Sequence, residues 1–258
     1  MAGPVHKAKY GIPDKALRVF ARVVADDLAM LASLHDKEPV NEFLQALRED
    51  GFPDGLGLKL LSENGQRATE LMKQALATLP EPTDEATLDE LAADYADIYL
   101  NHGIQASPQE SVWIDEENLI CQDTMFQVRA WYESHGLAAP DWRTRPDDHL
   151  VLELQFLTHL FKSDPTEEVL REAAQFMDEH LLRWLVDFGN RVGQRCATSY
   201  FAGVATLTSN YCDELRDLLA NILNEPRPSK EEIDKLMAPS REREEVEVSF
   251  VPGIGPAV

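Results

Sequence analysis

The sequence has few cysteines and few basic residues, and each scarcity argues against a class of protein. Its three cysteines include no C-x-x-C pair, and their odd number predicts neither a zinc site nor a disulfide framework. Lysine and arginine total 24 against 46 aspartates and glutamates, which gives a net charge of −22. So acidic a chain is poorly suited to bind nucleic-acid phosphates or an anionic membrane surface. The charge mainly favours solubility, but it also raises the encounter rate with a basic peptide.

Long apolar runs are missing as well. No segment reaches the length of a membrane span, and the first residues contain no apolar stretch of signal-peptide length. We therefore expect a cytoplasmic protein with reduced cysteines and no stable membrane insertion.

Several well-known enzyme motifs are also absent. The chain has no pair of Glu-x-x-His motifs for a di-iron bundle, no H-E-x-x-H, no glycine-rich phosphate loop and no serine nucleophile elbow. We predict no catalytic residue, no metal ligand and no cofactor.

Apolar residues recur at helical spacing along almost the whole chain. The first helix is expected to begin near Pro13 and to place one apolar face on Leu17, Val24, Leu28 and Leu31. The sequence predicts an all-α, single-domain helical bundle of roughly ten helices. Further helices are expected over 39–51, 71–80, 87–102 and 121–135, from 147 and from 165, and over 180–192 and 200–223.

The helical pattern stops near the C-terminus. We assign residues 1–224 to the helical domain and residues 225–258 to a proline-containing, charged extension, because Pro226, Pro228 and Pro239 interrupt the pattern. Within this extension a charge run at 241–245 precedes residues 246–251, whose alternation is typical of a short strand.

The most informative stretch is 146–157, where a loop ends at a proline and a strongly apolar helix begins. The acids in its first turn can cap free backbone N–H groups and complement the positive end of the helix. His149 lies in the same turn, and Glu153 lies four residues on, on the same face. Asp148, His149 and Glu153 are therefore expected to form a compact polar cluster, which either caps the helix or binds a ligand.

Other motifs accompany this stretch in chain order. A helix carrying Tyr95 and Tyr99 comes first, and the loop Pro-Gln-Glu-Ser-Val-Trp at 108–113 follows it. After the 146–157 stretch come two helices, Phe-Met-Asp-Glu-His-Leu-Leu-Arg-Trp-Leu at 176–185 and Tyr-Phe-Ala-Gly-Val-Ala-Thr-Leu-Thr at 200–208. In this order and spacing the motifs resemble the TorD/DmsD family of redox-enzyme maturation chaperones, over roughly residues 17–222. Each motif alone is weak, but together in sequence order they make a strong signal.

The resemblance implies a non-catalytic chaperone that acts as a monomer or a homodimer. Its client would be the catalytic subunit of a molybdenum-cofactor oxidoreductase, which is usually exported folded with a twin-arginine signal peptide. The chaperone would hold this signal and the apoprotein until the cofactor is in place. In the family the aspartate–histidine pair is implicated in binding the client peptide. The peptide-binding residues are therefore expected to be Tyr95, Tyr99, Pro108, Ser111, Trp113, Asp148, His149 and Glu153.

One position departs from the family pattern. Some members carry an aromatic residue directly after the loop proline, where this chain has Gln109. We therefore expect a less apolar groove at that point.

The aromatic residues have a second interpretation. Tyr95 and Tyr99 stand at helical spacing, and such aromatics more often belong to a core. Trp113 lies on a predicted loop, where a large aromatic is more typical of a binding surface. His180 and Trp184, four residues apart, are predicted to be packing residues.

Two other functions remain open. His35-Asp36 is similar to the HD pair of metal-dependent phosphohydrolases, so a helical enzyme is one alternative. A non-catalytic protein-docking adaptor, which would use the aromatic loop as its contact surface, is the other.

Overall fold

The computed structural model describes residues 14–115 and 118–238, and over these residues the chain is helical, with no strand. The predicted all-α class is confirmed. Eleven α-helices lie in the described part of the chain: α1 (Asp14–Asp36), α2 (Asn41–Glu49), α3 (Glu63–Thr78), α4 (Glu85–Tyr95), α5 (Ser111–Ile114), α6 (Asp123–Ser134), α7 (Leu150–Lys162), α8 (Glu167–Glu179), α9 (Leu185–Arg195), α10 (Ser199–Leu223) and α11 (Lys230–Met237).

Two short turns modify this series. A π-helical turn, Ala96–Leu100, extends α4, and a 3-10 turn, Leu181–Arg183, separates α8 from α9. His180 and Trp184 flank the 3-10 turn and are both fully buried, as expected of packing residues. No helix among the described residues is both long enough and apolar enough to cross a bilayer.

Several helices begin at side-chain caps that the sequence encodes. Ser62, Asp84 and Thr166 each accept a hydrogen bond from the backbone N–H three residues later, at the starts of α3, α4 and α8. Such a cap satisfies one of the free N–H groups of the first turn. The cap at Ser62 makes α3 begin well before the residues that we expected from apolar spacing.

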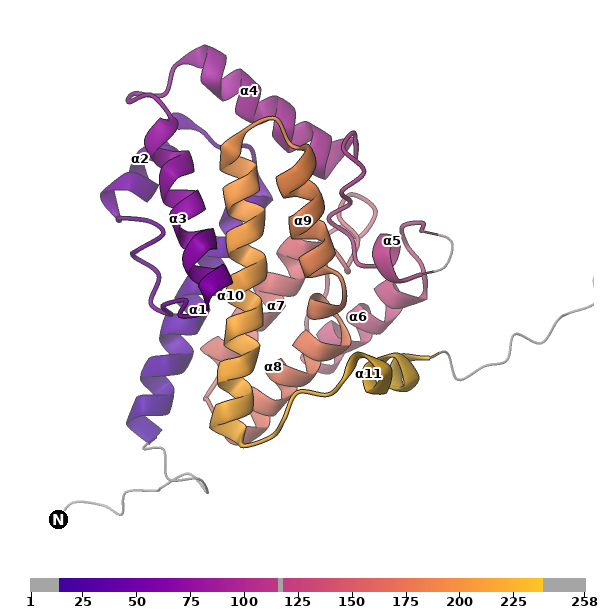
Figure 1. Cartoon of the computed structure of the whole chain (residues 1–258). Helices are drawn as coiled ribbons and strands as arrows, with labels where there is room; N and C mark the ends of the chain where they lie inside the picture. Colours follow the sequence, from indigo (N-terminus) through magenta and orange to yellow (C-terminus); the bar gives the residue numbers. More distant parts are fainter. Residues whose placement is uncertain (1–13, 116–117, 239–258) are drawn as a thin grey trace, which may run out of the picture. The chain divides into compact units, whose positions relative to one another are not determined.

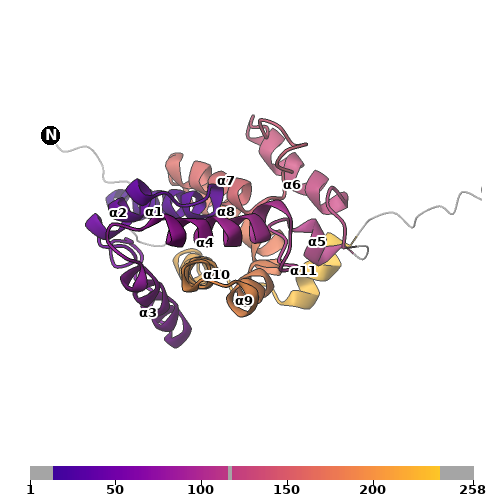
Figure 2. The same cartoon turned by 90° about the horizontal axis from the view of Figure 1, so that it is seen from above.

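The core forms where α1 packs on α7 and where α10 packs on α3, α8 and α9 (Figure 1). Seen from above, α10 lies between α3 and α9 (Figure 2). The largest fully buried side chains are aromatic and come mainly from α7 to α10: Trp184, Tyr200, Tyr211, Phe161, Phe176, Phe188 and Phe201. Burial of each such side chain contributes roughly 1.5–3 kcal/mol, so this core supplies most of the driving force for folding.

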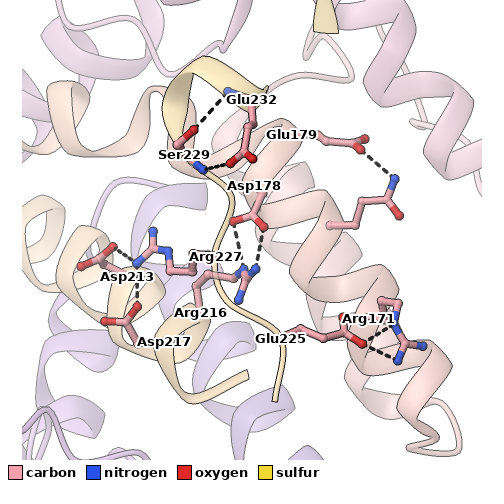
Figure 3. A network of polar contacts seen from close by, with 11 residues as sticks. Arg171, Asp178, Glu179, Asp213, Arg216, Asp217, Glu225, Arg227, Ser229 and Glu232 are labelled. Carbon is pink, nitrogen blue, oxygen red and sulfur yellow. Dashed lines mark hydrogen bonds and ion pairs between the residues drawn. The ribbon is translucent and has the colours of Figure 1, made fainter. Parts of the chain in front are cut away.

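Contacts within the chain divide it into two units, Met1–Arg227 and Pro228–Val258. Residues 225–227, which we assigned to the extension, belong to the first unit by this criterion. Glu225 forms an ion pair with Arg171 of α8, and Arg227 forms ion pairs with two aspartates of α10 (Figure 3).

The second unit contains one helix that the sequence analysis missed, α11. Ser229 and Glu232 form a reciprocal capping box at its start. The Ser-x-x-Glu pattern was a readable signal for this helix. The expected strand at 246–251, the charge run at 241–245, Pro13 and Pro239 lie outside the described residues.

Candidate functional site

The loop that begins at Pro108 lies directly against the start of α7. Gln109 and His149 form an antiparallel bridge. The backbone N–H of Leu150 donates to the carbonyl of Pro108 at 2.9 Å. Two of the motifs that are separate in the sequence thus form one structural unit, which we call the loop–α7 junction (residues 108–111 and 148–150).

Asp148 holds this junction together. Its Oδ2 accepts hydrogen bonds from both the backbone N–H of Ser111, at 2.9 Å, and the Ser111 hydroxyl. Its backbone carbonyl accepts from the N–H of Glu110 at 3.0 Å. Asp148 and Ser111 are fully buried. The carboxylate therefore caps α5, a helix that precedes it by almost forty residues, and this cap explains why Trp113 lies in a short helix instead of the predicted loop.

His149 caps its own helix. Its Nδ1 accepts a hydrogen bond from the backbone N–H of Val151 at 3.1 Å. Burial, which disfavours the charged ring, lowers the pKa of His149 to about 3. The imidazole is therefore neutral near pH 7 and carries its proton on Nε2. This geometry matches the capping interpretation of His149, and its contact with a peptide stays a prediction.

Glu153 lies one turn further along α7 and is fully buried. Its Oε2 accepts a 3.4 Å hydrogen bond from the indole N–H of Trp184. Burial, and then the nearby carboxyls of Glu110 and Asp148, raise the pKa of Glu153 well above its ordinary value. The predicted polar cluster exists, but it lies inside the protein.

Glu110 extends the buried cluster toward α9. Its Oε2 lies 3.1 Å from Nδ1 of His180, the residue that precedes the 3-10 turn. Burial raises the pKa of Glu110 well above its usual range and lowers the pKa of His180 to about 4. The imidazole of His180 is therefore neutral near pH 7, so its contact with Glu110 is a hydrogen bond and not an ion pair.

The raised pKa of Glu153 predicts that the difference in stability between the wild type and Glu153→Gln depends on pH. A carboxyl whose pKa is raised by folding does not weaken the folded state below its unfolded pKa, near 4.5, where it is protonated in both states. As pH rises above that value, the unfolded chain ionises first, so the folded state loses stability until the pH reaches the folded pKa. Glu153→Gln removes this loss, because a neutral amide cannot ionise. We expect the variant to gain stability relative to the wild type as pH rises above 5, by up to about 1.4 kcal/mol per pH unit.

Urea unfolding at pH 5 and pH 8 measures this difference. Glu133→Gln, at an exposed position of α6, controls for the loss of one negative charge. A gap between Glu153→Gln and the wild type that stays constant between the two pH values would contradict the prediction.

Tyr95 and Tyr99 form hydrogen bonds with residues at the end of α1. Both are buried, and their rings lie tilted against each other with centroids 4.8 Å apart. The Tyr95 hydroxyl donates to the backbone carbonyl of Asp36 at 2.8 Å, and the Tyr99 hydroxyl lies 2.5 Å from Nδ1 of His35. These contacts match the core interpretation of the two tyrosines, which places neither on the surface.

The same contacts argue against the phosphohydrolase alternative. The hydroxyl proton of Thr208 goes to a backbone carbonyl, so Nε2 of His35 donates to this hydroxyl at 2.9 Å and Nδ1 accepts from Tyr99. Both ring nitrogens are therefore used, and Asp36 is paired with Arg145. Among the described residues no group of three or more histidine, cysteine or carboxylate side chains could hold a metal ion.

Trp113 faces a cleft of about 850 Å³. The indole N–H donates to the carbonyl of Ser107 at 2.8 Å, which fixes the ring in the cleft wall. Leu119 and Ile120 add apolar surface, with 55% and 48% of their areas exposed. Among the residues that the structure describes, the lining consists of His102, Gln105, Ser107, Val112, Trp113, Asn118, Leu119, Ile120, Asp187 and Arg191.

The loop before Pro108 forms one side of this cleft and is hydrogen-bonded to α9. His102 and Gln105 both have φ near 56°, a left-handed conformation that costs a non-glycine residue on the order of 1 kcal/mol. Arg191 donates to the carbonyl of Gln105 at 3.1 Å, and Arg195 donates to the carbonyl of Ile104 at 3.0 Å. The sequence analysis missed these residues, because loop polarity and two arginines on a helix carry no local signal of a cleft.

The motifs of this all-helical protein gather at one loop–helix junction, beside a cleft that polar and apolar side chains line together. Residues 59–190, just over half of the chain, match the family model of the nitrate reductase delta subunit. The chain therefore belongs to this family, which includes the TorD and DmsD chaperones and consists of non-catalytic chaperones. The resemblance inferred from the motifs is confirmed.

Curated relatives agree with this assignment. The chain is 30% identical over 133 residues to the chaperone protein TorD of Vibrio vulnificus (strain CMCP6), which covers 48% of this chain and 61% of that protein. It is 28% identical over 211 residues to the chaperone protein TorD of Vibrio atlanticus (strain LGP32), covering 77% and 95%. The match to the first of these spans only about three fifths of that relative's length.

Proposed function

We propose that the protein is a cytoplasmic chaperone for the catalytic subunit of a molybdenum-cofactor oxidoreductase. In this proposal it binds the twin-arginine signal peptide and the apoprotein, and it assists cofactor insertion before export. Family membership supports the chaperone class, and the relatives named TorD support it independently. The observation that carries the peptide-binding part is the cleft at Trp113, whose exposed apolar wall stands beside the motifs of the family.

The size and lining of the cleft suit part of a signal peptide. A volume of about 850 Å³ accommodates a few side chains of an extended segment, not a folded domain. Burial of each large apolar side chain is worth roughly 1.5–3 kcal/mol, whereas an exposed ion pair is worth roughly 0.2–1 kcal/mol. Apolar contacts with Trp113, Leu119 and Ile120 would therefore supply most of the affinity. The cost of ordering a flexible peptide keeps the expected dissociation constant near the micromolar range.

The structure suggests how the buried motif residues serve this site. Asp148 and His149 hold the loop–α7 junction, and Glu153 is buried one turn further along α7. We therefore propose that the three residues position the cleft wall rather than touch the peptide. Pro108 and Ser111 belong to the same junction. Of the eight residues expected in the site, Trp113 is the one that lines the cleft.

Trp113→Ala tests the proposal directly. We expect it to weaken binding of the client's signal peptide by about tenfold or more, because the variant loses a large aromatic contact in the cleft wall. The melting temperature should fall only slightly, since the ring is part of the cleft wall and not of the central core. Calorimetric titration with the synthetic signal peptide measures the affinity.

Trp142 provides the matched control. It is another partly exposed tryptophan, at 38% exposure, and it does not line the cleft. Trp142→Ala should therefore bind the signal peptide like the wild type. Equal losses in the two variants, or no loss in Trp113→Ala, would exclude the cleft as the peptide site.

A further inference from the structure

The exposed face of Trp113 is covered by an arginine of the same chain. The guanidinium carbon of Arg191, on α9, lies 4.5 Å from the centroid of the indole ring. One of its nitrogens donates to the backbone carbonyl of Gln105 at 3.1 Å. A guanidinium is thus bound by an aromatic face and a carbonyl, inside the cleft that we assign to the signal peptide.

A carboxylate lines the same cleft. It belongs to Asp187, which lies one turn before Arg191 on α9. It is exposed, and its side chain forms no ion pair with any residue that the structure describes. An aromatic face, a carbonyl and a free carboxylate are the partners that a planar guanidinium uses better than a lysine ammonium does, because only the guanidinium both stacks and donates in a fork.

We propose that Trp113 and the Gln105 carbonyl form a guanidinium-binding subsite, which Arg191 fills when no peptide is bound, and that Asp187 in the same cleft pairs with an incoming arginine. An arginine of the bound peptide displaces Arg191 and takes its place on the indole. For the identity of the peptide this inference rests on the proposed function. The subsite itself is defined by residues of the cleft.

Arg191 is suited to be displaced. Its side chain is exposed, and with the residues that the structure describes its head group makes one hydrogen bond and one stacking contact. The loop that it touches has a second attachment, because Arg195 donates to the carbonyl of Ile104 and to Oε1 of Gln105, both at 3.0 Å. The loop therefore stays attached to α9 when Arg191 leaves.

In this proposal Asp187 is the acid that faces the peptide's arginine. The sequence suggested the Asp148 cluster for that role, but Asp148 is buried and engaged with Ser111. Asp187 is exposed on the cleft wall and has no competing partner among the described residues. With a net charge of −22, the protein as a whole also attracts an incoming cation.

Arg191→Ala empties the subsite and tests the proposal without a signal peptide. The probes are N-acetyl-arginine amide and N-acetyl-lysine amide, titrated to millimolar concentrations against the ¹⁵N-labelled full chain. The readout is the indole N–H signal of Trp113, identified by its loss in Trp113→Phe. We expect the arginine probe to bind Arg191→Ala about three- to tenfold more tightly than the wild type, with a smaller change for the lysine probe.

Two further variants sharpen the test. Arg143→Ala removes an exposed arginine that stacks on Trp142 and does not line the cleft, and it should leave binding of the arginine probe as in the wild type. Asp187→Asn, added to Arg191→Ala, should remove most of the gain. Arg191→Gln serves as a second emptied subsite if the alanine variant folds poorly.

The subsite is refuted if Arg191→Ala binds the arginine probe no better than the wild type does. Equal affinity for the two probes in Arg191→Ala also refutes it, because stacking should favour the guanidinium. The proposed function can fail independently of the subsite. A subsite that binds the arginine probe in a protein that binds no signal peptide contradicts the chaperone proposal alone. A signal peptide whose arginines can be changed to lysine without loss contradicts the subsite alone.

Discussion

Replacing Asp148 with alanine is expected to lower the free energy of unfolding by about 3 kcal/mol. The carboxylate accepts two hydrogen bonds from Ser111, and the variant leaves both of those buried donors without a partner. A buried hydrogen bond to a charged group is worth roughly 1.5–3 kcal/mol, and an unsatisfied buried donor costs a further 1–3 kcal/mol. Relief of the desolvated carboxylate offsets part of this loss. Urea unfolding monitored by circular dichroism measures the effect.

A double-mutant cycle separates the cap from other roles of Asp148. Ser111→Ala removes the hydroxyl donor and should cost only about 1 kcal/mol, and the double variant should be less destabilised than the sum of the two single variants. Additive effects would show that the two residues act independently. Unchanged stability of Asp148→Ala with lost peptide affinity would instead identify Asp148 as a direct peptide contact, as the sequence motif suggested.

Arg216→Met should destabilise the protein by about 3–5 kcal/mol, because it leaves a buried charge unpaired. Arg216 of α10 forms two hydrogen bonds with the carboxylate of Asp178 of α8, at 2.9 and 2.7 Å (Figure 3). Their side chains are only 5% and 10% exposed. Thermal and urea unfolding of the variant measure the loss.

A nearby ion pair offers the matched control. Arg171 and Glu225 form a similar forked contact, but their side chains are 46% and 44% exposed. Arg171→Met should cost no more than about 1 kcal/mol, as is usual for exposed pairs. Similar losses in the two variants would mean that burial does not set the strength of these contacts.

The sequence predicted the helical class well, because the spacing of apolar residues is a property of each segment by itself. Apolar spacing along α1 and α10 reflects which face of each helix is buried. The starts of α3 and α4 were predicted too late, because the caps at Ser62 and Asp84 were not used. Helix α11 was missed because the flanking prolines dominated the pattern, although Ser229 and Glu232 marked its start.

The candidate site was predicted only in part, for a physical reason. The motifs at 108–113 and 148–153 do meet, but their sequence does not tell whether an acid turns inward or outward. Asp148 turns inward because Ser111 offers two donors there, and this pairing depends on residues far apart in the chain. The cleft beside Trp113 likewise combines the loop at 102–107 with α9, so no single segment reveals it.

The hydrogen bond between Glu110 and His180 has a consequence for the entropy of binding. Glu110 immediately precedes α5, which carries Trp113, and His180 precedes the turn that leads into α9, which carries Arg191. The segments that lead into the two sides of the cleft, α5 and α9, are therefore joined by a hydrogen bond in the interior of the protein. Folding fixes the distance between the walls before any peptide arrives. The loss of conformational freedom on binding then falls almost entirely on the peptide, so a stiffer client segment should bind more tightly than a flexible one with the same side chains.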